Sequence, residues 1–334
     1  MKYRYQLEPY KGTSTRFQCP NCEQQKTYTR YVDTKTNQRL PFKYGRCERL
    51  NKCGYHLNPY TAGYQLADDN NDFYKKNILH QAVKKPHYIP DDLFEQSLQC
   101  YDQNNFVQFL MELFGTEKAM ELVQIYHIGS SNYWQGSTVF WIIDNSSEQN
   151  KIVGGQLVLF DTNGNTAKKE LPDGTTFRYT RWVHTALNHV YKKRNTSIPK
   201  WLTNYCKYGN KFPVPFGLTS IDESKPIAIV EAPKTAIIAK GYLPQYNWLA
   251  IGSASYLNNA NRLLPLAGKN ITLFPDAGCY DNWHSRGQQF SYFANFNTSD
   301  LLERKNTTPG SDLADYLVQI DYTQFLKLKI KTNE

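Results

Sequence analysis

Long apolar runs are missing from this 334-residue sequence, as are internal repeats and low-complexity segments. No stretch approaches the roughly 20 apolar residues that a membrane-spanning helix needs. Residues 1–5 lack the apolar core of a secretory signal peptide. We therefore expect a cytoplasmic protein with no membrane partner, and a chain of this length has room for two or three domains.

Disulfide pairing is not indicated, because the seven cysteines are an odd number and four of them have the spacing of metal ligands. Cys19 and Cys22 enclose two residues, and Cys47 and Cys53 enclose five. Two such pairs can present four thiolates to one tetrahedral ion, so we predict a zinc β-ribbon. A closed shell of four ligands leaves no position for water, so this zinc is expected to be structural.

Two alternatives stay open for this segment. His56 follows Cys53 closely and could replace it as the fourth zinc ligand. The four thiols could also be reduced cysteines in a small core, although the segment around them is too hydrophilic to favour that interpretation.

Acidic residues are scarce in residues 1–60, which hold four of them against twelve lysines and arginines. That segment carries most of the formal net charge of +9. Residues 166–200 form a second basic stretch. With an aromatic content of 14%, these patches indicate a nucleic-acid partner, and single-stranded DNA is the form we expect. The alternative is a solvated basic surface without a partner.

Composition divides the chain into four segments. A polar, basic and cysteine-containing segment comes first, and an acidic, loop-like linker follows it. An α+β middle domain comes next, and strands alternate with helices in the last third. We expect boundaries at 1–62 for the zinc ribbon, 63–90 for the linker, 91–220 for the middle domain and 221–334 for the C-terminal domain.

Apolar periodicity and turn residues place the elements within these segments. In the ribbon we expect strands at 27–31 and 40–45. In the middle domain we expect helices at 91–101, 105–114 and 116–124, strands at 138–144 and 152–161, and an irregular stretch at 166–215. In the last third we expect strands at 226–230, 248–251 and 270–274, and helices at 235–240, 256–264, 281–293 and 312–320.

The alternation in the last third predicts a parallel sheet covered by helices, so the fold class is α/β. In such sheets, ligands bind at the carboxyl ends of the strands. Carboxylates stand at two of these ends, where Glu231 closes Ile227-Ala-Ile-Val-Glu231 and Asp276 closes Ile271-Thr-Leu-Phe-Pro-Asp276. A third acidic group, Asp312 and Asp315, follows Gly310.

These three segments resemble the acidic motifs of Toprim domains and of Toprim-like primases from phages and mobile elements. The order of zinc ribbon, middle domain and Toprim-like domain also resembles bacterial replicative primases. The chain is most similar to primase-like proteins of Bacteroidetes mobile elements, whose ribbon ends in a GRC…CGYH pattern. Here that pattern is Gly45-Arg46-Cys47 and Cys53-Gly54-Tyr55-His56.

The resemblance implies a role for each acidic residue. Glu231 would do acid–base or metal work, and Asp276 would hold Mg²⁺ or Mn²⁺. Asp312 or Asp315 would support them, and Lys234, near a helix start, would contact phosphate.

One departure weakens this assignment. Toprim domains carry Asp-x-Asp at the second motif, whereas Asp276-Ala-Gly here lacks the second aspartate. Asp281 lies five residues further on and could swing into the site to bind the cofactor, although its position is not equivalent. The alternative role for Glu231 and Asp276 is to cap helices at strand-to-helix turns, and Asp312 is equally suited to an N-cap. Lys234 could simply be exposed.

The resemblance favours a primase-like nucleotidyltransferase of a mobile element, with a helicase or another replication protein as a possible partner. A non-catalytic DNA-binding or partner-binding protein with a degenerate Toprim domain is the alternative, and the missing aspartate favours it. A metal-dependent nuclease is a third interpretation. Whether the chain is an enzyme stays open at this point.

Overall fold

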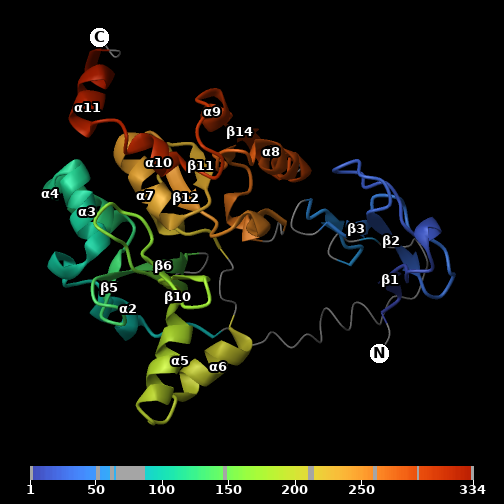
Figure 1. Cartoon of the computed structure of the whole chain (residues 1–334), viewed down its shortest axis with the longest axis horizontal. Coiled ribbons are helices and arrows are strands. Elements are labelled where there is room, and N and C mark those ends of the chain that lie inside the picture. Colours follow the sequence, from blue (N-terminus) through green and yellow to red (C-terminus); the bar gives the residue numbers. More distant parts are fainter. Residues whose placement is uncertain are drawn as a thin grey trace. The chain divides into compact units, whose positions relative to one another are not determined.

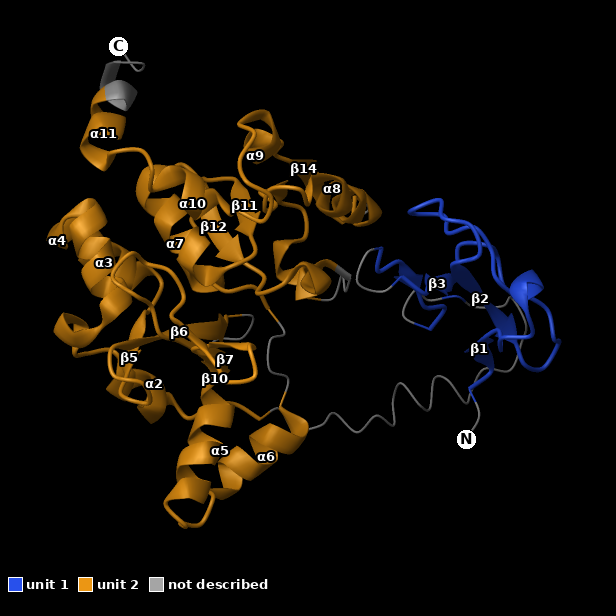
Figure 2. Cartoon of the chain, viewed as in Figure 1, with its two compact units in different colours: residues 1–83 blue, residues 84–334 orange. Residues whose placement is uncertain are grey.

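The computed structural model describes residues 3–49, 53–60, 64, 87–145, 149–209, 214–258, 262–291 and 293–331. The chain forms two compact units, residues 1–83 and residues 84–334 (Figures 1 and 2). Most of the linker expected at 63–90 lies outside the described residues. None of the helices in the described ranges has the length and apolarity to cross a bilayer.

Unit 1 is built on a four-stranded antiparallel sheet with the strand order β1-β2-β3-β4. A small aromatic core of Tyr5, Tyr31, Leu40 and Tyr44 stabilises one part of it, and the buried cysteines surround Tyr28 in another. The strands are β1 (Tyr5–Leu7), β2 (Tyr28–Asp33), β3 (Gly45–Cys47) and β4 (His56–Leu57).

The strand expected at 27–31 is present as β2, but the prediction of a strand at 40–45 is wrong. β3 begins only at Gly45, and the residues before it form a turn. The Leu40 amide donates to the Tyr31 carbonyl over 2.9 Å, and the Tyr44 amide donates to the Pro41 carbonyl. The turn points Leu40 and Tyr44 into the same core, so their apolar character reflects burial and not a strand.

The first half of unit 2 contains an antiparallel sheet with the strand order β10-β7-β6-β5. Alternate residues of the buried strand β6 enter different cores: Val139, Trp141 and Ile143 pack on one face, and Phe140 and Ile142 on the other. The strands are β5 (Gly129–Ser131), β6 (Ser137–Asp144), β7 (Lys151–Val158) and β10 (Thr180–Trp182), with a separate hairpin of β8 (Lys168–Glu170) and β9 (Thr176–Arg178).

Helices of this half agree with their expected positions where apolar spacing was regular. Asn104 caps α3 by accepting hydrogen bonds from the Phe106 and Val107 amides. Gly115, at a φ of +83°, separates α3 from α4, a conformation that favours glycine. The first helix is shorter than expected and ends at Ser97. The helices are α2 (Asp91–Ser97), α3 (Asn105–Phe114) and α4 (Thr116–Ile125).

The prediction that residues 166–215 are irregular is wrong. This stretch contains the β8–β9 hairpin, strand β10 and two helices, α5 (Val183–Lys193) and α6 (Lys200–Tyr208). Both helices are short, polar and basic, and each buries only two residues. Their periodic signal is therefore weak, and packing against the sheet through Ala186 and Tyr205 stabilises them.

The second half of unit 2 is a parallel sheet with the strand order β12-β11-β13-β14, and it confirms the expected α/β class. Strand β14 was not expected, because only Phe296 is buried among its four residues. The strands are β11 (Ile227–Val230), β12 (Asn247–Ala250), β13 (Asn270–Leu273) and β14 (Asn295–Thr298).

Helices cover this sheet on both faces. The prediction of an α-helix at 256–264 is wrong, because 3₁₀ turns occupy Ala254–Asn258 and Leu264–Leu266. Residues 259–261 lie outside the described ranges. Pro265 lacks the amide hydrogen that a continuing α-helix requires. The helices are α7 (Pro233–Tyr242), α8 (Tyr280–Gln289), α9 (Leu301–Arg304), α10 (Leu313–Leu317) and α11 (Tyr322–Lys331).

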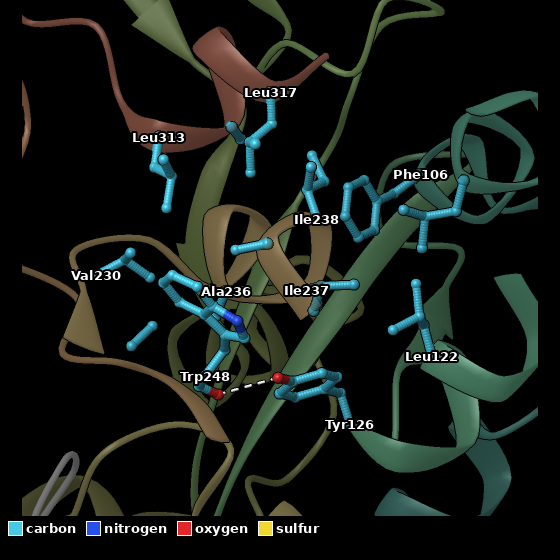
Figure 3. Close-up of a cluster of buried hydrophobic side chains, with 14 of the residues drawn as sticks. Phe106, Leu122, Tyr126, Val230, Ala236, Ile237, Ile238, Trp248, Leu313 and Leu317 are labelled. Atoms are coloured by element: carbon cyan, nitrogen blue, oxygen red, sulfur yellow. Dashed lines mark hydrogen bonds between the residues drawn. The ribbon is translucent and has the colours of Figure 1, made fainter. Parts of the chain in front are cut away.

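The two halves of unit 2 share one apolar core. Figure 3 shows Phe106 and Leu122 of α3 and α4 near Ile237 and Ile238 of α7, with Leu313 and Leu317 of α10 on the other side. The Tyr126 hydroxyl donates to the Trp248 carbonyl over 3.0 Å and ties the end of α4 to β12. This core packs the carboxyl end of β11 against α7 and α10.

Candidate functional site

The four expected zinc ligands meet in unit 1. Their Sγ atoms all lie within 4.8 Å of one another. Cys19 and Cys53 are 3.7 Å apart, and Cys22 and Cys47 are 3.9 Å apart. A tetrahedral site with Zn–S bonds of about 2.3 Å requires sulfur atoms about 3.8 Å apart, so the cluster fits zinc. Cys19, Cys47 and Cys53 are buried.

The surroundings of the sulfur atoms support the metal shell. The Asn21 amide nitrogen lies 3.5 Å from the Cys53 Sγ and the Arg49 guanidinium 3.8 Å from the Cys22 Sγ, as donors to thiolates. His56 lies elsewhere, since its Nε2 hydrogen-bonds to the Tyr31 hydroxyl over 2.9 Å and the two rings stack. Cys53 is therefore the fourth ligand, and the closed thiolate shell makes the zinc structural.

Cations outnumber acids among the described residues of unit 1. Among its described acids, Asp33 pairs with Arg4, Glu48 with Arg16 and Glu8 with Arg39. Lys11, Lys26, Lys35 and Lys43 are exposed. An aromatic group accompanies them: Phe42 is 45% exposed, and the Arg30 guanidinium lies 5.4 Å from its ring centre. Cations beside an exposed ring suit the phosphates and bases of a single strand.

Glu231 and Asp276 lie at neighbouring strand ends in unit 2. Glu231 directly follows β11, and Asp276 comes three residues after β13. The two strands are paired in parallel, with Ile229 opposite Leu273, so both chains leave the sheet at the same edge. The Phe274 amide continues the pairing by donating to the Ile229 carbonyl over 2.8 Å.

Backbone hydrogen bonds bring the third acidic segment to this edge. The Ala277 amide donates to the Ser311 carbonyl, and the Gly310 amide donates to the Ala277 carbonyl, both over 2.9 Å. Asp276 and Asp312 each adjoin one of these bonded residues. We name Glu231, Asp276, Asp312 and Asp315 the acidic edge.

Asp312 and Asp315 cap α10 and hold the start of α7. Asp312 Oδ1 accepts from the Asp315 amide and Asp315 Oδ2 from the Asp312 amide, which forms a capping box. Asp312 Oδ2 accepts from the Thr235 hydroxyl over 2.7 Å. Lys234 Nζ lies 3.5 Å from Asp315 Oδ1. Asp312 therefore has the N-cap role, and Lys234 is paired and only 17% exposed in its side chain.

The charges of the acidic edge act on one another. Burial, together with the charges of Glu231, Asp312 and Asp315, raises the pKa of Asp276 to about 7. Burial also raises the pKa of Glu231, and the charge of Asp312 adds to that effect. Two half-buried carboxyl groups that resist ionisation in each other's presence form a site whose charge a cation would balance.

The distances at this edge limit how an ion could bind. Within the described residues, only the four cysteines form a group of three or more ligand atoms mutually within 4.8 Å. Mg²⁺ is commonly held by one or two carboxylates plus water and substrate phosphates, so Glu231 and Asp276 fit that mode. Asp281 is exposed in the first turn of α8 and is not among the largest charge effects on Asp276.

One further acid lies near this edge and has no counterpart among the expected site residues. Glu303 of α9 accepts a hydrogen bond from the Gly278 amide over 3.1 Å, and its other oxygen is buried without a hydrogen-bond partner within the described chain. Burial raises the pKa of the Cys279 thiol, and the charges of Asp276, Glu231 and Glu303 add to that effect. The signal that could have found Glu303 is its position after β14, a strand that the sequence did not reveal.

The β8–β9 hairpin and β10 carry the second basic patch. Lys168, Lys169 and Arg178 are exposed on the hairpin. Arg181 donates to the Tyr133 hydroxyl over 2.7 Å, with its guanidinium 5.6 Å from the Tyr133 ring centre. The patch therefore combines cations with aromatic rings, as in unit 1.

The chain thus combines a structural zinc ribbon with an α/β unit that has an acidic sheet edge. Residues 104–277 match the family described as a domain of unknown function, DUF6371, and the chain belongs to that family, because the match covers more than half of its length. Residues 3–68 match the family described as a zinc beta-ribbon finger. No curated protein sequence matches the chain.

Two solved structures are similar to this chain. The primase fragment of the bacteriophage T7 primase-helicase has 10% identity and a TM-score of 0.37, and the match covers 94% of this chain and 98% of that one. The DnaG catalytic core has 11% identity and a TM-score of 0.30, with 72% and 78% covered. Similarity at this level carries no argument about function.

Proposed function

We propose that this chain is a primase-like nucleic-acid protein of the cytoplasm that acts in the replication of a mobile element. The ribbon binds single-stranded DNA, and the acidic edge, in the manner of a Toprim domain, binds Mg²⁺ or Mn²⁺ with a nucleotide. The observation that carries the proposal is the meeting of Glu231 and Asp276 at neighbouring strand ends, with the Asp312 segment bonded to the same loop.

Each residue of the edge has a distinct task in this proposal. Glu231 and Asp276 hold the cation, whose charge offsets the burial and the neighbouring negative charges that raise the pKa of Asp276. When bound, the ion polarises a phosphate and favours ionisation of an attacking hydroxyl. Lys234 exchanges its contact with Asp315 for a phosphate oxygen. Asp312 keeps the first turn of α7 in place through Thr235.

The basic surfaces supply the contacts to nucleic acid. Exposed lysines and Phe42 of unit 1 bind phosphates and stack on a base, and the basic residues of the β8–β9 hairpin guide the strand. A helicase or another replication protein is the partner that we expect for such a role.

Primer synthesis tests the proposal directly. The protein is incubated with single-stranded DNA, the four ribonucleoside triphosphates and Mg²⁺ or Mn²⁺, and labelled RNA products are resolved on a gel. Glu231→Gln and Asp276→Asn should lower the yield by at least about 10-fold, because loss of even an outer partner of a metal costs about 10- to 100-fold in activity. The matched control is Asp281→Asn, an exposed carboxylate nearby that should leave synthesis unchanged.

A second function has its own support. The Asp-x-Asp motif expected after β13 has only its first aspartate, Asp276, and both oxygens of Asp312 already accept hydrogen bonds. A non-catalytic protein that binds DNA or a replication partner would have this degenerate edge. It predicts salt-sensitive DNA binding with no metal-dependent product under any condition of the synthesis assay. Cleavage of plasmid DNA in the same buffers would instead indicate a nuclease.

A further inference from the structure

A cavity of about 240 Å³ lies in unit 2 between the antiparallel sheet and the carboxyl edge of the parallel sheet. Its lining includes four aromatic rings, one side-chain amide and one guanidinium. The residues that matter are Phe140, Gln156, Trp182, Phe216, Tyr256 and Arg262.

One wall is a row across three strands. Trp182 of β10 lies opposite Gln156 of β7, and Gln156 lies opposite Phe140 of β6. Residues directly opposite in antiparallel strands point to the same face of a sheet, so the three side chains stand side by side. Trp182 is 36% exposed and Phe140 is 1% exposed, so the row runs from the cavity mouth to its buried end.

The opposite wall comes from segments beside the parallel sheet. The Phe216 amide donates to the Ala250 carbonyl over 2.8 Å, which extends the β12 edge. Tyr256 is buried, and the Arg262 guanidinium lies 4.8 Å from its ring centre. This wall is therefore a rigid aromatic surface with one cation.

The cavity adjoins the acidic edge. Gly252, which lines it, donates its amide hydrogen to the Glu231 carbonyl over 2.7 Å. Pro233, also in the lining, is the first residue of α7 and precedes Lys234. A ligand with its ring in the cavity would thus present the rest of its length to Glu231 and Lys234.

The lining matches a planar heteroaromatic ring with polar edges. Aromatic side chains stack on the face of any nucleobase. The side-chain amide of Gln156 makes no hydrogen bond within the described part of the chain. Its NH₂ donor and its oxygen acceptor can therefore bind the edge of a base. The volume is below the 300–1,000 Å³ or so typical of whole-ligand pockets, which suits one ring system and not an entire nucleotide.

We propose that this cavity binds the base of a nucleoside triphosphate whose phosphates reach the acidic edge. The inference rests on the proposed nucleotide site and adds to it the residues that hold the base: Trp182 stacks on the ring, and Gln156 binds its edge. Arg262 contributes positive charge at the wall.

Calorimetric titration of the full chain separates the base from the phosphates. ATP and inorganic tripolyphosphate are titrated in the presence of Mg²⁺, and adenosine is titrated without metal. GTP and CTP are titrated as nucleotides with other bases. Trp182→Ala should weaken ATP and adenosine binding at least about fivefold, the lower limit for loss of one stacking contact. Tripolyphosphate binding should not change, and Trp182→Phe should retain most of the affinity.

Tyr208→Ala is the matched control, because Tyr208 is an aromatic residue of unit 2 that is 46% exposed and lies outside the cavity lining. Equal losses for ATP and tripolyphosphate in Trp182→Ala, or no loss for either, would overturn the inference while leaving the phosphate site standing. Adenosine binding that survives Asp276→Asn, together with loss of tripolyphosphate binding, supports the base cavity independently. If Asp276→Asn leaves tripolyphosphate binding intact, the proposed metal site fails and the cavity does not. If no probe binds, both fail.

Discussion

The hydroxyl of Thr235 donates a 2.7 Å hydrogen bond to the carboxylate of Asp312, across 77 residues of sequence. It joins the first turn of α7 to the N-terminus of α10 beside the acidic edge. Because the other Asp312 oxygen accepts from the Asp315 amide, this carboxylate is fully engaged in positioning two helix starts. Asp312 thus positions two helix starts, and in the proposed site the cation contacts are assigned to Glu231 and Asp276.

Replacement of Thr235 by valine removes this bond and keeps the shape of the side chain. Thr235 is 1% exposed, so water cannot readily take its place at the Asp312 oxygen. We expect a loss of about 1–3 kcal/mol in the free energy of unfolding, the range for a hydrogen bond to a charged group. Urea unfolding followed by tryptophan fluorescence measures it in unit 2, since all six tryptophans lie beyond residue 84.

Thr203→Val serves as the control for that measurement. Thr203 is an exposed helical threonine whose hydroxyl makes only a 3.4 Å contact with the Pro199 carbonyl. Equal urea midpoints for Thr235→Val and wild type would show that the bond does not hold the two helices together.

The stability of unit 2 should fall with rising pH when no divalent cation is added. Asp276 has a pKa raised to about 7 in the folded chain, mainly by burial, against about 3.9 in an unfolded chain. Between these values the folded state holds a proton that the unfolded state has lost, so the free energy of unfolding decreases as pH rises. Allowing for partial solvent screening, we expect a change on the order of 1 kcal/mol.

Asp276→Asn should weaken this pH dependence, leaving the smaller part that comes from Glu231, and make the protein more stable at pH 8 than the wild type. Added Mg²⁺ should stabilise the wild type at pH 8 and have little effect on the variant. A wild-type urea midpoint that stays constant or rises between pH 5 and pH 8, while Asp276→Asn behaves identically, would count against a buried charge at this position.

Local patterns in the sequence predicted several parts of the fold correctly. The cysteine spacing identified the zinc cluster, and the apolar runs at 226–230 and 248–251 identified two buried parallel strands, β11 and β12. Strand β14 escaped prediction because its burial rests on Phe296 alone. Helices α5 and α6 were not predicted because only two residues of each are buried, which gives a weak apolar periodicity.

The approach of the Asp312 segment to the acidic edge has no local signal in the sequence. Asp276 and Asp312 come near each other through backbone hydrogen bonds between Ala277 and the 310–311 segment. Backbone groups look the same at every position of a sequence, so such pairing cannot be read from residue types. The choice between Cys53 and His56 as zinc ligand was also not predictable from residue types. It depends on the hydrogen bond of His56 to Tyr31, a residue 25 positions away in the sequence.

Cys53→Ser should release zinc, whereas His56→Ala should retain it. The chain should hold one zinc ion with four protected thiols, so a thiol reagent should reach only Cys100, Cys206 and Cys279 in the native state. A chelator should expose four more, because folding of a ribbon depends on its metal. Zinc retained by Cys53→Ser but lost from His56→Ala would reverse the ligand assignment.

Measurements of single-stranded DNA affinity and of its salt dependence should distinguish a stacking contact of Phe42 from a phosphate contact of Lys43. Phe42→Ala should weaken binding at least about fivefold with an unchanged salt slope, since stacking involves no counterions. Lys43→Ala should reduce the slope of log affinity against log salt by about 0.7, one phosphate contact on a single strand. Fluorescence anisotropy between 50 and 200 mM salt gives both quantities, and identical slopes for all three proteins would exclude Lys43 from the interface.

The most direct test of the central claim is Mn²⁺ binding at the ends of β11 and β13, followed by electron paramagnetic resonance of the free ion. We expect one Mn²⁺ per chain in the wild type and in Asp281→Asn. Glu231→Gln and Asp276→Asn should each lower the affinity at least about tenfold, since even outer partners of a metal contribute about 10- to 100-fold. Equal Mn²⁺ affinity in all four proteins would contradict the claim that Glu231 and Asp276 form a cation site.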